Sequence, residues 1–371
     1  MKSHTDTTAR DPLNILIIGP LPPPLDGASL PVFRLIEGLR KRSDVTISMI
    51  NISRSRETVI QIIRMALVTL WKTLILGRHA NVITFHANQN GRLFFGPLIY
   101  LITRCLRRPL VMRAFGGTFD QQYLRIPKIH QWLMRHTYFN AEVCLFETKR
   151  LVTFFNSIHV RRSEWYSNST QDVGLTDNTP FKETCKKLIF VGRVTPTKGI
   201  DEILATASLL DEGVSIDIFG PLDATYSTYN NLNKKGLGRI RYRGVIDKND
   251  IAKTLWEYDA LVLPTYWMGE GYPAVVLEAY AHGLPVITTR WQSIPEIVDE
   301  RSGILVEPHD ISGLAQAVNH IHRQKDEYTR LQHGARKRFQ EFESAYWDAK
   351  FTDFCYAAAG NKPKEQFRPH E

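Results

Sequence analysis

Two short stretches of this chain combine cations and carboxylates at spacings that suit the binding of a phosphorylated ligand. In the first, Gly192-Arg-Val-Thr-Pro-Thr-Lys-Gly199, the glycine turn directly follows the apolar run 188–191, a predicted strand. Arg193 offers a planar fork for two phosphate oxygens, and Lys198 adds a compact point charge. The turn therefore predicts a diphosphate site at the carboxyl end of a strand, where charge that develops on a departing phosphate is stabilised.

The second stretch, Glu270-Gly-Tyr-Pro-Ala-Val-Val-Leu-Glu278, places two carboxylates around the start of a predicted helix. A helix that begins at Pro273 presents free backbone N–H groups, which attract anions. Ionised Glu270 and Glu278 only accept hydrogen bonds, so they suit the hydroxyl groups of a sugar and of a ribose. Together the two stretches predict a nucleotide-sugar site. The alternative is that these charged side chains are solvated surface groups.

The length and the cysteine pattern narrow the class of protein. A chain of 371 residues suits two domains. The four cysteines form no Cys-x-x-Cys pair, which is typical of thiols in a reducing compartment. The first residues lack the apolar core of a signal peptide, and no uninterrupted apolar run is long enough to predict a spanning helix. We therefore expect a cytoplasmic protein.

The charge is distributed unevenly along the chain. The net charge is +9, and residues 58–119 contain eight Lys or Arg and no Asp or Glu. Apolar segments at 62–76 and 93–102 carry Trp and Tyr, so this region predicts peripheral contact with the anionic inner face of the cytoplasmic membrane. The alternatives are core-facing helices of an α/β domain and a nucleic-acid surface. We expect no nucleic-acid partner, because no recognition-helix pattern is visible.

Strand-like and helix-like runs alternate from end to end, which predicts an α/β protein with two Rossmann-like, doubly wound parallel sheets. Strands are expected at 13–19, 45–51, 82–86, 110–115, 143–147, 164–167, 187–191, 215–219, 240–243, 260–263, 285–288 and 303–306. Helices are expected at 28–42, 57–77, 92–106, 121–139, 148–156, 199–211, 249–257, 273–282, 294–300 and 311–323.

These runs group into two domains. We expect a first domain at 1–168, a linker at 169–182 and a second domain at 183–343, with a helix at 344–358 that packs back on the first domain. The polar tail 360–371 is expected to be disordered. Ligands of doubly wound sheets bind outside the carboxyl ends of the strands, so we expect the site in a cleft where the two domains face each other.

The motifs resemble glycosyltransferase family 4, whose members are retaining enzymes of GT-B architecture. The resemblance is carried by the two stretches above, by Ile294-Pro-Glu-Ile-Val298 and by Leu305-Val-Glu-Pro-His-Asp310. It covers about residues 185–330 closely and the first domain more loosely, through Gly19-Pro-Leu-Pro-Pro-Pro-Leu-Asp-Gly27 and the strand-end His86. Asp26 and Gly27 stand where relatives usually have two adjacent glycines.

The resemblance implies a role for each matching position. The residues that act on the reacting sugar and its diphosphate would be Arg193, Lys198, Glu270 and His86. Those that bind the donor would be Gly192, Gly271, Tyr272, Pro273, Ala274, Val275 and Glu278, with Gly244, Val245 and Ile246 near the nucleobase. Gly27 and Asp120 would lie on the acceptor side, although Asp120 also suits a helix-capping role before 121–139.

The resemblance also implies a reaction. A hexose would pass with retention from a UDP- or GDP-sugar to a lipid-linked or surface-polysaccharide acceptor, and the departing phosphate would take the acceptor's proton. The chain contains no Asp-x-Asp, and Arg193 and Lys198 supply positive charge, so we expect no metal and no other cofactor. The alternatives are a soluble transferase with a small-molecule acceptor and an inactive nucleotide-sugar sensor.

Overall fold

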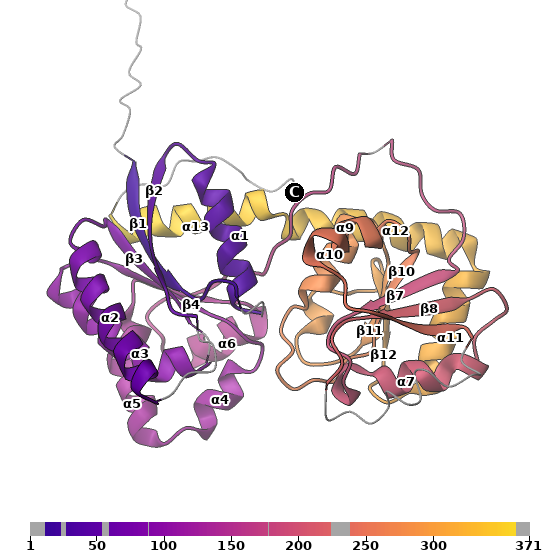
Figure 1. Cartoon of the computed structure of the whole chain (residues 1–371), viewed down its shortest axis with the longest axis horizontal. Coiled ribbons are helices and arrows are strands. Elements are labelled where there is room, and N and C mark those ends of the chain that lie inside the picture. Colours follow the sequence, from indigo (N-terminus) through magenta and orange to yellow (C-terminus); the bar gives the residue numbers. More distant parts are fainter. Residues whose placement is uncertain are drawn as a thin grey trace, which may run out of the picture. The chain divides into compact units, whose positions relative to one another are not determined.

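The computed structural model describes residues 12–23, 27–53, 59–87, 89–176, 178–223 and 238–360. The chain divides into two compact units: residues up to Tyr166 with those from Ala345 onward, and Ser167–Ser344. Each unit contains its own parallel sheet (Figure 1). The segment expected as a linker, 169–182, is counted with the second unit. The tail expected to be disordered lies, after Gly360, outside the described residues.

The first unit contains a six-stranded sheet in the order β2-β1-β3-β4-β5-β6, and all its neighbouring strands pair in parallel. Its strands are β1 (Leu13–Gly19), β2 (Val45–Asn51), β3 (Val82–Ala87), β4 (Leu110–Ala114), β5 (Val143–Phe146) and β6 (Ser163–Trp165). The order reverses between β1 and β3. Loops that leave the sheet on either side of such a reversal leave room for a ligand at its carboxyl edge.

Both faces of this sheet are covered because successive side chains of a strand point to opposite sides. In β1, Ile15 and Ile17 belong to one apolar core, whereas Leu16 and Ile18 belong to the other. The first core is covered by α1 (Ser29–Arg40) and α13 (Ser344–Ala358). The second is covered by α2 (Val59–Gly77), α3 (Gln89–Cys105), α4 (Phe119–Arg125), α5 (Lys128–His136), η1 (Tyr138–Asn140) and α6 (Lys149–Ser157).

Helix α13 brings the end of the described chain back onto the first sheet. Trp347 is fully buried, and its ring lies edge-on to Tyr166 with 5.4 Å between the ring centroids. Phe351, one helical turn later, lies 5.6 Å from the His86 ring. The first unit is therefore completed by residues far from it in the sequence.

The second unit contains a parallel sheet in the order β12-β11-β10-β7-β8-β9. Its strands are β7 (Lys187–Val191), β8 (Ser215–Phe219), β9 (Ile240–Gly244), β10 (Ala260–Leu263), β11 (Val286–Thr289) and β12 (Gly303–Val306). The order reverses between β7 and β10, which lie side by side. This is the strand order of a dinucleotide-binding fold, and the reversal predicts the place of a ligand.

Helices cover the second sheet as well. They are α7 (Ile200–Ala205), α9 (Lys248–Leu255), α10 (Ala274–Ala281), α11 (Ile311–Arg323) and α12 (Lys325–Phe339), with single turns η2 (Pro196–Lys198), η3 (Thr206–Ser208), η4 (Ile294–Glu296) and η5 (Gln340–Phe342). Helix α10 packs against α12, and α11 packs against α7. In Figure 1, α9 and α10 lie above the sheet and α7 lies below it.

All twelve expected strands are present, but three expected helices are wrong in extent. The helix expected at 121–139 is divided into α4 and α5, since Pro127 forces Ile126 into an extended conformation. Of the helix expected at 199–211, only the first part forms an α-helix, α7, and the single turn η3 follows it. At 294–300 a single turn forms, because the Asp299 side chain accepts backbone N–H groups two and three residues ahead and so favours a turn.

Asp348 on α13 predicts a pH dependence of the first unit's stability. Burial raises the pKa of this carboxyl to about 7, and Arg113 opposes the rise. Because the folded pKa is above the unfolded value of about 4, the contribution to stability is complete below about pH 4 and is lost as the pH rises through about 7. We expect the stability of Asp348→Asn, relative to wild type, to increase over this range. Urea unfolding at several pH values measures the difference, and parallel profiles would contradict the expectation.

Candidate functional site

The strand reversal in the second sheet places two of the predicted stretches next to each other. The loop after β7 carries Arg193 and Lys198, and the loop after β10 leads to Glu270 and α10. Since β7 and β10 are neighbours with the same direction, both loops leave the sheet at one edge. Residues 72 positions apart in the sequence can therefore meet.

The two loops are in direct backbone contact. The Tyr266 N–H donates to the Thr197 carbonyl at 2.9 Å. Gly199 has φ +78°, and a Cβ added there would lie 2.2 Å from the Pro264 carbonyl oxygen. A residue with a side chain would be strained in its backbone and would push the loops apart. Gly199 therefore fixes the position of Lys198, its neighbour in the turn.

Lys198 and Glu270 form a buried ion pair at this edge. The Lys198 Nζ lies 2.5 Å from Glu270 Oε2, and the two residues are only 9% and 5% exposed. The Thr265 hydroxyl donates to the same carboxylate oxygen at 2.7 Å. Of the three donor hydrogens of a lysine ammonium, one serves Glu270 here. The structure thus brings together two residues that the sequence predicted for one site.

The Trp267 ring lies close to both predicted cations, Arg193 and Lys198. The Arg193 guanidinium carbon lies 5.2 Å from the Trp267 ring centroid, and Lys198 Nζ lies 4.9 Å from it. The backbone at Gly269 lies under the same indole, because a Cβ there would be 2.6 Å from a ring carbon. Sequence reasoning missed Trp267. Its only signal is its place in the loop between a strand and Glu270.

Three glycines line the carboxyl ends of neighbouring strands. Gly192 follows β7, Gly220 follows β8, and Gly244 ends β9. The Gly220 N–H donates to the Gly244 carbonyl at 2.8 Å, and a Cβ at Gly220 would lie 1.8 Å from the Gly192 carbonyl oxygen. Gly220, with φ +137°, was not among the predicted residues. The edge of the sheet here is bare backbone, which a flat ligand group can approach closely.

Helix α10 begins where the sequence predicted an anion site. Pro273 is its N-cap residue, and Ala274 and Val275 form its first turn. The Tyr272 hydroxyl donates to Glu296 at 2.6 Å and its ring packs on Phe342, so that side chain belongs to the unit's interior. The backbone groups of Gly271 to Val275, rather than their side chains, are therefore what this segment can present to a ligand.

Three further predicted positions have less specific surroundings. Glu278 is half-buried on the second turn of α10, and its carbonyl accepts a hydrogen bond from His282. Val245 and Ile246 follow β9, and Val245 is exposed. Their assignment to the ribose and the nucleobase stays a prediction.

His86 occupies a different environment from the one its proposed role requires. It lies in β3, as expected, but its side chain is completely buried under Phe351. Its Nε2 lies 3.1 Å from the Thr84 hydroxyl, and its Nδ1 has no partner among the described residues. Burial, and then the charge of Arg113, lowers the pKa of His86 well below its usual value. A neutral, enclosed imidazole does not support the predicted contact with the reacting sugar.

The two residues predicted for the acceptor side have different surroundings. Gly27 lies in an exposed turn before α1, and a Cβ there would meet nothing within 4 Å. Asp120 does not cap a helix: it is the second residue of α4, and its carboxylate binds the Arg150 guanidinium. The capping alternative is therefore wrong, since the N-cap position belongs to Thr118.

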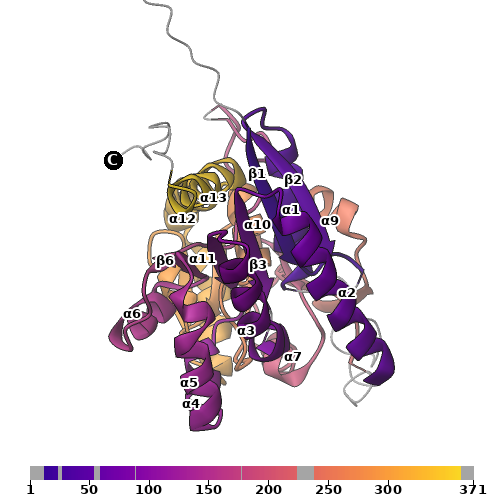
Figure 2. The same cartoon turned by 90° about the vertical axis from the view of Figure 1, so that its left-hand side faces the viewer.

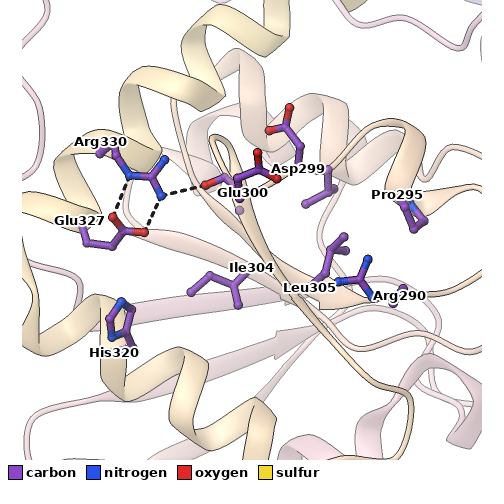
Figure 3. Close-up of a pocket in the computed structure, with 11 residues that line it drawn as sticks. Arg290, Pro295, Asp299, Glu300, Ile304, Leu305, His320, Glu327 and Arg330 are labelled. Carbon is purple, nitrogen blue, oxygen red and sulfur yellow. Dashed lines mark hydrogen bonds and ion pairs between the residues drawn. The ribbon is translucent and has the colours of Figure 1, made fainter.

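A separate hollow of about 480 Å³ lies beside the edge strand β12. Figure 3 shows Ile304 and Leu305 at its centre, with Arg330 bound to Glu327 at 2.7 Å and to the Glu300 carbonyl. None of the residues predicted to bind a donor lines it. Within the described ranges, the hollow included, no three His, Cys, Asp or Glu side chains are grouped so that they could hold a metal ion.

Comparison with known proteins finds similarity within the second unit. Residues 185–324 match the family model described as glycosyl transferases group 1. A D-inositol 3-phosphate glycosyltransferase of Streptomyces bingchenggensis is 31% identical over 46% of this chain and 40% of its own length. An uncharacterized 41.2 kDa protein in the cps region of Klebsiella pneumoniae is 28% identical over 36% of each chain. The matched segments thus span between a third and two fifths of these relatives.

Solved structures extend the likeness to both units. Anabaena HepE in complex with UDP aligns with a TM-score of 0.71 at 13% identity, covering 93% of this chain and 100% of that one. The lipopolysaccharide outer core galactosyltransferase WaaB, in its apo form, aligns with a TM-score of 0.66 at 13% identity, over 93% and 99%. At this identity the likeness establishes the fold, which is the two-unit GT-B fold that the sequence predicted.

Proposed function

We propose that this chain, whose residues 185–324 match the family model described as glycosyl transferases group 1, transfers a hexose from a nucleotide-diphosphate sugar, with retention and without a metal. The observation that carries the proposal is the arrangement of Arg193 and Lys198 on one indole ring, with Lys198 paired to Glu270, at the strand reversal of the second sheet.

The two cations suit the diphosphate of the donor. As the bond between the sugar and the phosphate breaks, negative charge grows on the departing oxygen. A hydrogen-bond donor of the protein that is already in place when this charge develops lowers the activation barrier by roughly 3 kcal/mol. Arg193 is exposed and can place its fork on two phosphate oxygens, whereas Lys198 is fixed by its ion pair. The N-terminus of α10 adds backbone N–H groups.

Glu270 serves two partners in this proposal. Its buried carboxylate orients the Lys198 ammonium, and its other oxygen can accept a hydrogen bond from a sugar hydroxyl. Positioning of the sugar and positioning of the cation are thereby linked through one side chain. We infer that the pair exists before the donor binds, so that little reorganisation is needed during transfer.

The proton of the acceptor needs no protein base in this mechanism. The bond between the anomeric carbon and the phosphate oxygen breaks, a bond from that carbon to the acceptor oxygen forms on the same face, and the acceptor's proton passes to the departing phosphate oxygen. The buried, neutral His86 is not required for any of these steps. The protein contributes positioning and charge.

The proposed classes of sugar donor and acceptor are based on proteins that are similar to this chain. HepE has been solved with UDP-glucose, which supports a UDP-sugar over a GDP-sugar here. In this proposal Glu278, half-buried on α10, accepts a hydrogen bond from the ribose. A relative in a cps region and the likeness to WaaB support an acceptor that is lipid-linked or part of a surface polysaccharide. The similarity to D-inositol 3-phosphate glycosyltransferases favours a second candidate, a small phosphorylated acceptor.

A panel of UDP- and GDP-sugars tests the proposal. A specific donor at a hundred times its dissociation constant should stabilise the protein by about 2.7 kcal/mol in a thermal-shift assay. The same donor should then lose its sugar to a glycan acceptor or slowly to water. Binding without any turnover would indicate the inactive sensor. If no nucleotide-sugar binds, the proposal is wrong.

Trp267 offers a milder test of the arrangement. In Trp267→Ala, Arg193 and Lys198 lose the ring that holds both, and each such contact is worth roughly 0.5–1 kcal/mol. The two contacts together are worth about 1–2 kcal/mol, so we expect binding of the nucleoside diphosphate to weaken by about five- to thirtyfold, as measured by calorimetry. Trp256→Ala, an exposed tryptophan on the same unit, is the matched control. Equal affinities in the two variants would remove Trp267 from the site.

A further inference from the structure

Helix α2 presents an outward face that is apolar and basic at the same time. We define the α2 face as the exposed apolar side chains Ile63, Leu67, Val68, Trp71, Leu74 and Ile75 with the cations Arg64, Lys72 and Arg78. Leu67 and Trp71 are 63% and 62% exposed, although such residues are usually buried. The opposite side of the helix supplies the core, with Met65, Ala66, Leu70 and Leu76 packed against it.

The spacing makes the α2 face a single stripe. Ile63, Leu67, Trp71 and Ile75 recur every four residues, so they lie on one side of the helix. Arg64 and Lys72 lie on the same exposed half of the helix, and Arg78 is an exposed residue directly after its end at Gly77. The core-facing alternative for this region is thus correct for only one side of α2, and the other side presents apolar surface to its surroundings.

The neighbouring helices extend this surface. Helix α3 contacts both α2 and α5 and lies between them (Figure 2). It exposes Leu98 and Leu101, and α5 exposes Ile129 and Trp132. Exposed apolar side chains therefore occur on three helices, each of which contacts the next. A large amount of exposed apolar surface of this kind marks an interaction site.

The excess of positive charge on this part of the chain favours an anionic partner. Residues 58–141 contain eleven Lys or Arg and one acidic residue, Asp120, whose carboxylate is bound by Arg150. A protein partner would have to match this surface with its own carboxylates. An anionic bilayer combines negatively charged headgroups with an apolar layer of acyl chains beneath them, and so matches both properties of the surface. Trp71 and Trp132 are the residue type that favours the boundary between headgroups and acyl chains. No helix within the described ranges is long and apolar enough to cross a membrane.

We propose that the α2 face, extended by α3 and α5, docks flat on the surface of an anionic lipid bilayer. The apolar side chains enter the headgroup boundary, and Arg64, Lys72 and Arg78 contact lipid phosphates. This inference depends on the first unit alone, and its test needs neither donor nor turnover. Docking would bring the protein next to any lipid-linked acceptor in the same bilayer.

Sedimentation of the full chain with vesicles of phosphatidylcholine, with and without phosphatidylglycerol, tests the proposal. Wild type should sediment only with the anionic vesicles and should be released by salt. Leu67→Gln/Trp71→Gln should lower the partition coefficient at least tenfold. Arg64→Gln/Lys72→Gln/Arg78→Gln should lower it on anionic vesicles on the order of a hundredfold. Leu209→Gln, at an exposed leucine of the second unit, is the control and should bind as wild type.

The native cysteines give a second readout that does not depend on a variant's folding. Cys105 at the end of α3 is exposed, whereas the other three cysteines are buried. A polarity-sensitive fluorophore on Cys105 should shift to shorter wavelength when anionic vesicles are added.

Three results would overturn the proposal: wild type that stays in the supernatant, variants that bind like wild type, or a dimer that Leu67→Gln/Trp71→Gln converts to a monomer. The last outcome would assign the α2 face to a second copy of the chain.

Discussion

Lys198→Ala should lower the rate of transfer by on the order of a hundred- to a thousandfold, the usual loss when one fixed donor to a developing anion is removed. The loss should appear in kcat more than in KM, because the charge that Lys198 meets grows as the sugar departs. Steady-state kinetics with the donor identified by thermal shift measures it. Lys187→Ala, at the opposite end of β7 and exposed, should transfer at the wild-type rate.

The ion pair with Glu270 requires a second variant in this experiment. Lys198→Ala leaves a carboxylate that is 5% exposed without its partner, and breaking a buried pair costs roughly 3–5 kcal/mol. Lys198→Ala/Glu270→Gln removes the uncompensated charge and should recover the lost stability without recovering transfer. If the double variant regained both, the loss in Lys198→Ala would be one of folding, and Lys198 would not act on the leaving group.

Trp347→Ala should produce a loss of stability as large as that of breaking the buried ion pair, but in the first unit. The side chain is fully buried between α13 and the first sheet and contacts Trp165 and Tyr166. Removing a buried tryptophan costs roughly 3–5 kcal/mol through lost burial and the cavity left behind. We expect the unfolding transition of the first unit to shift to lower urea concentration while that of the second unit stays in place.

A conservative control lies on the same helix. Ala345→Ser changes an exposed position near the start of α13 and should alter stability by less than about 0.5 kcal/mol. A loss below about 1 kcal/mol in Trp347→Ala would mean that α13 contributes little to the first core. Hydrogen exchange of β5 amides, which lie in that core, would show which unit is affected.

The fold was predictable because its strands are short apolar runs that are bounded by turn residues. Central strands such as β7 are buried on both faces by helices, and this gives a continuous apolar signal. The ends of the helices were harder to predict. Ile294, Ile297 and Val298 are buried at helix-like spacing, yet they belong to one turn followed by the Asp299 turn. Burial, which the sequence suggests, does not specify backbone conformation.

The site was predictable in composition and only partly in geometry. Strand order brings Lys198 and Glu270 to one edge, and their residue types indicate a diphosphate and a sugar. Their direct pairing depends on the contact of Gly199 with Pro264, which no local pattern encodes. Trp267 carries no signal of its own, since an exposed loop tryptophan resembles many others.

His86 illustrates the opposite limit. Its place at the end of β3 was predicted, and a histidine there is accessible in an open sheet edge. Phe351, which lies more than 260 residues later on α13, covers its ring. The side chain's environment is therefore determined by α13, a helix that the sequence predicted to pack on the first domain without indicating which strand end it covers.

The central claim is that Arg193 and Lys198 hold the donor diphosphate by their charge. The most direct measurement compares the binding of a nucleoside diphosphate with that of its nucleoside, in the presence of a chelator, for wild type and for Arg193→Gln/Lys198→Gln. Two charged contacts should give wild type a preference for the diphosphate on the order of a hundredfold or more, and the variant should lose most of it. A variant that keeps the full preference, or a wild type that shows none until a divalent ion is restored, would contradict the account.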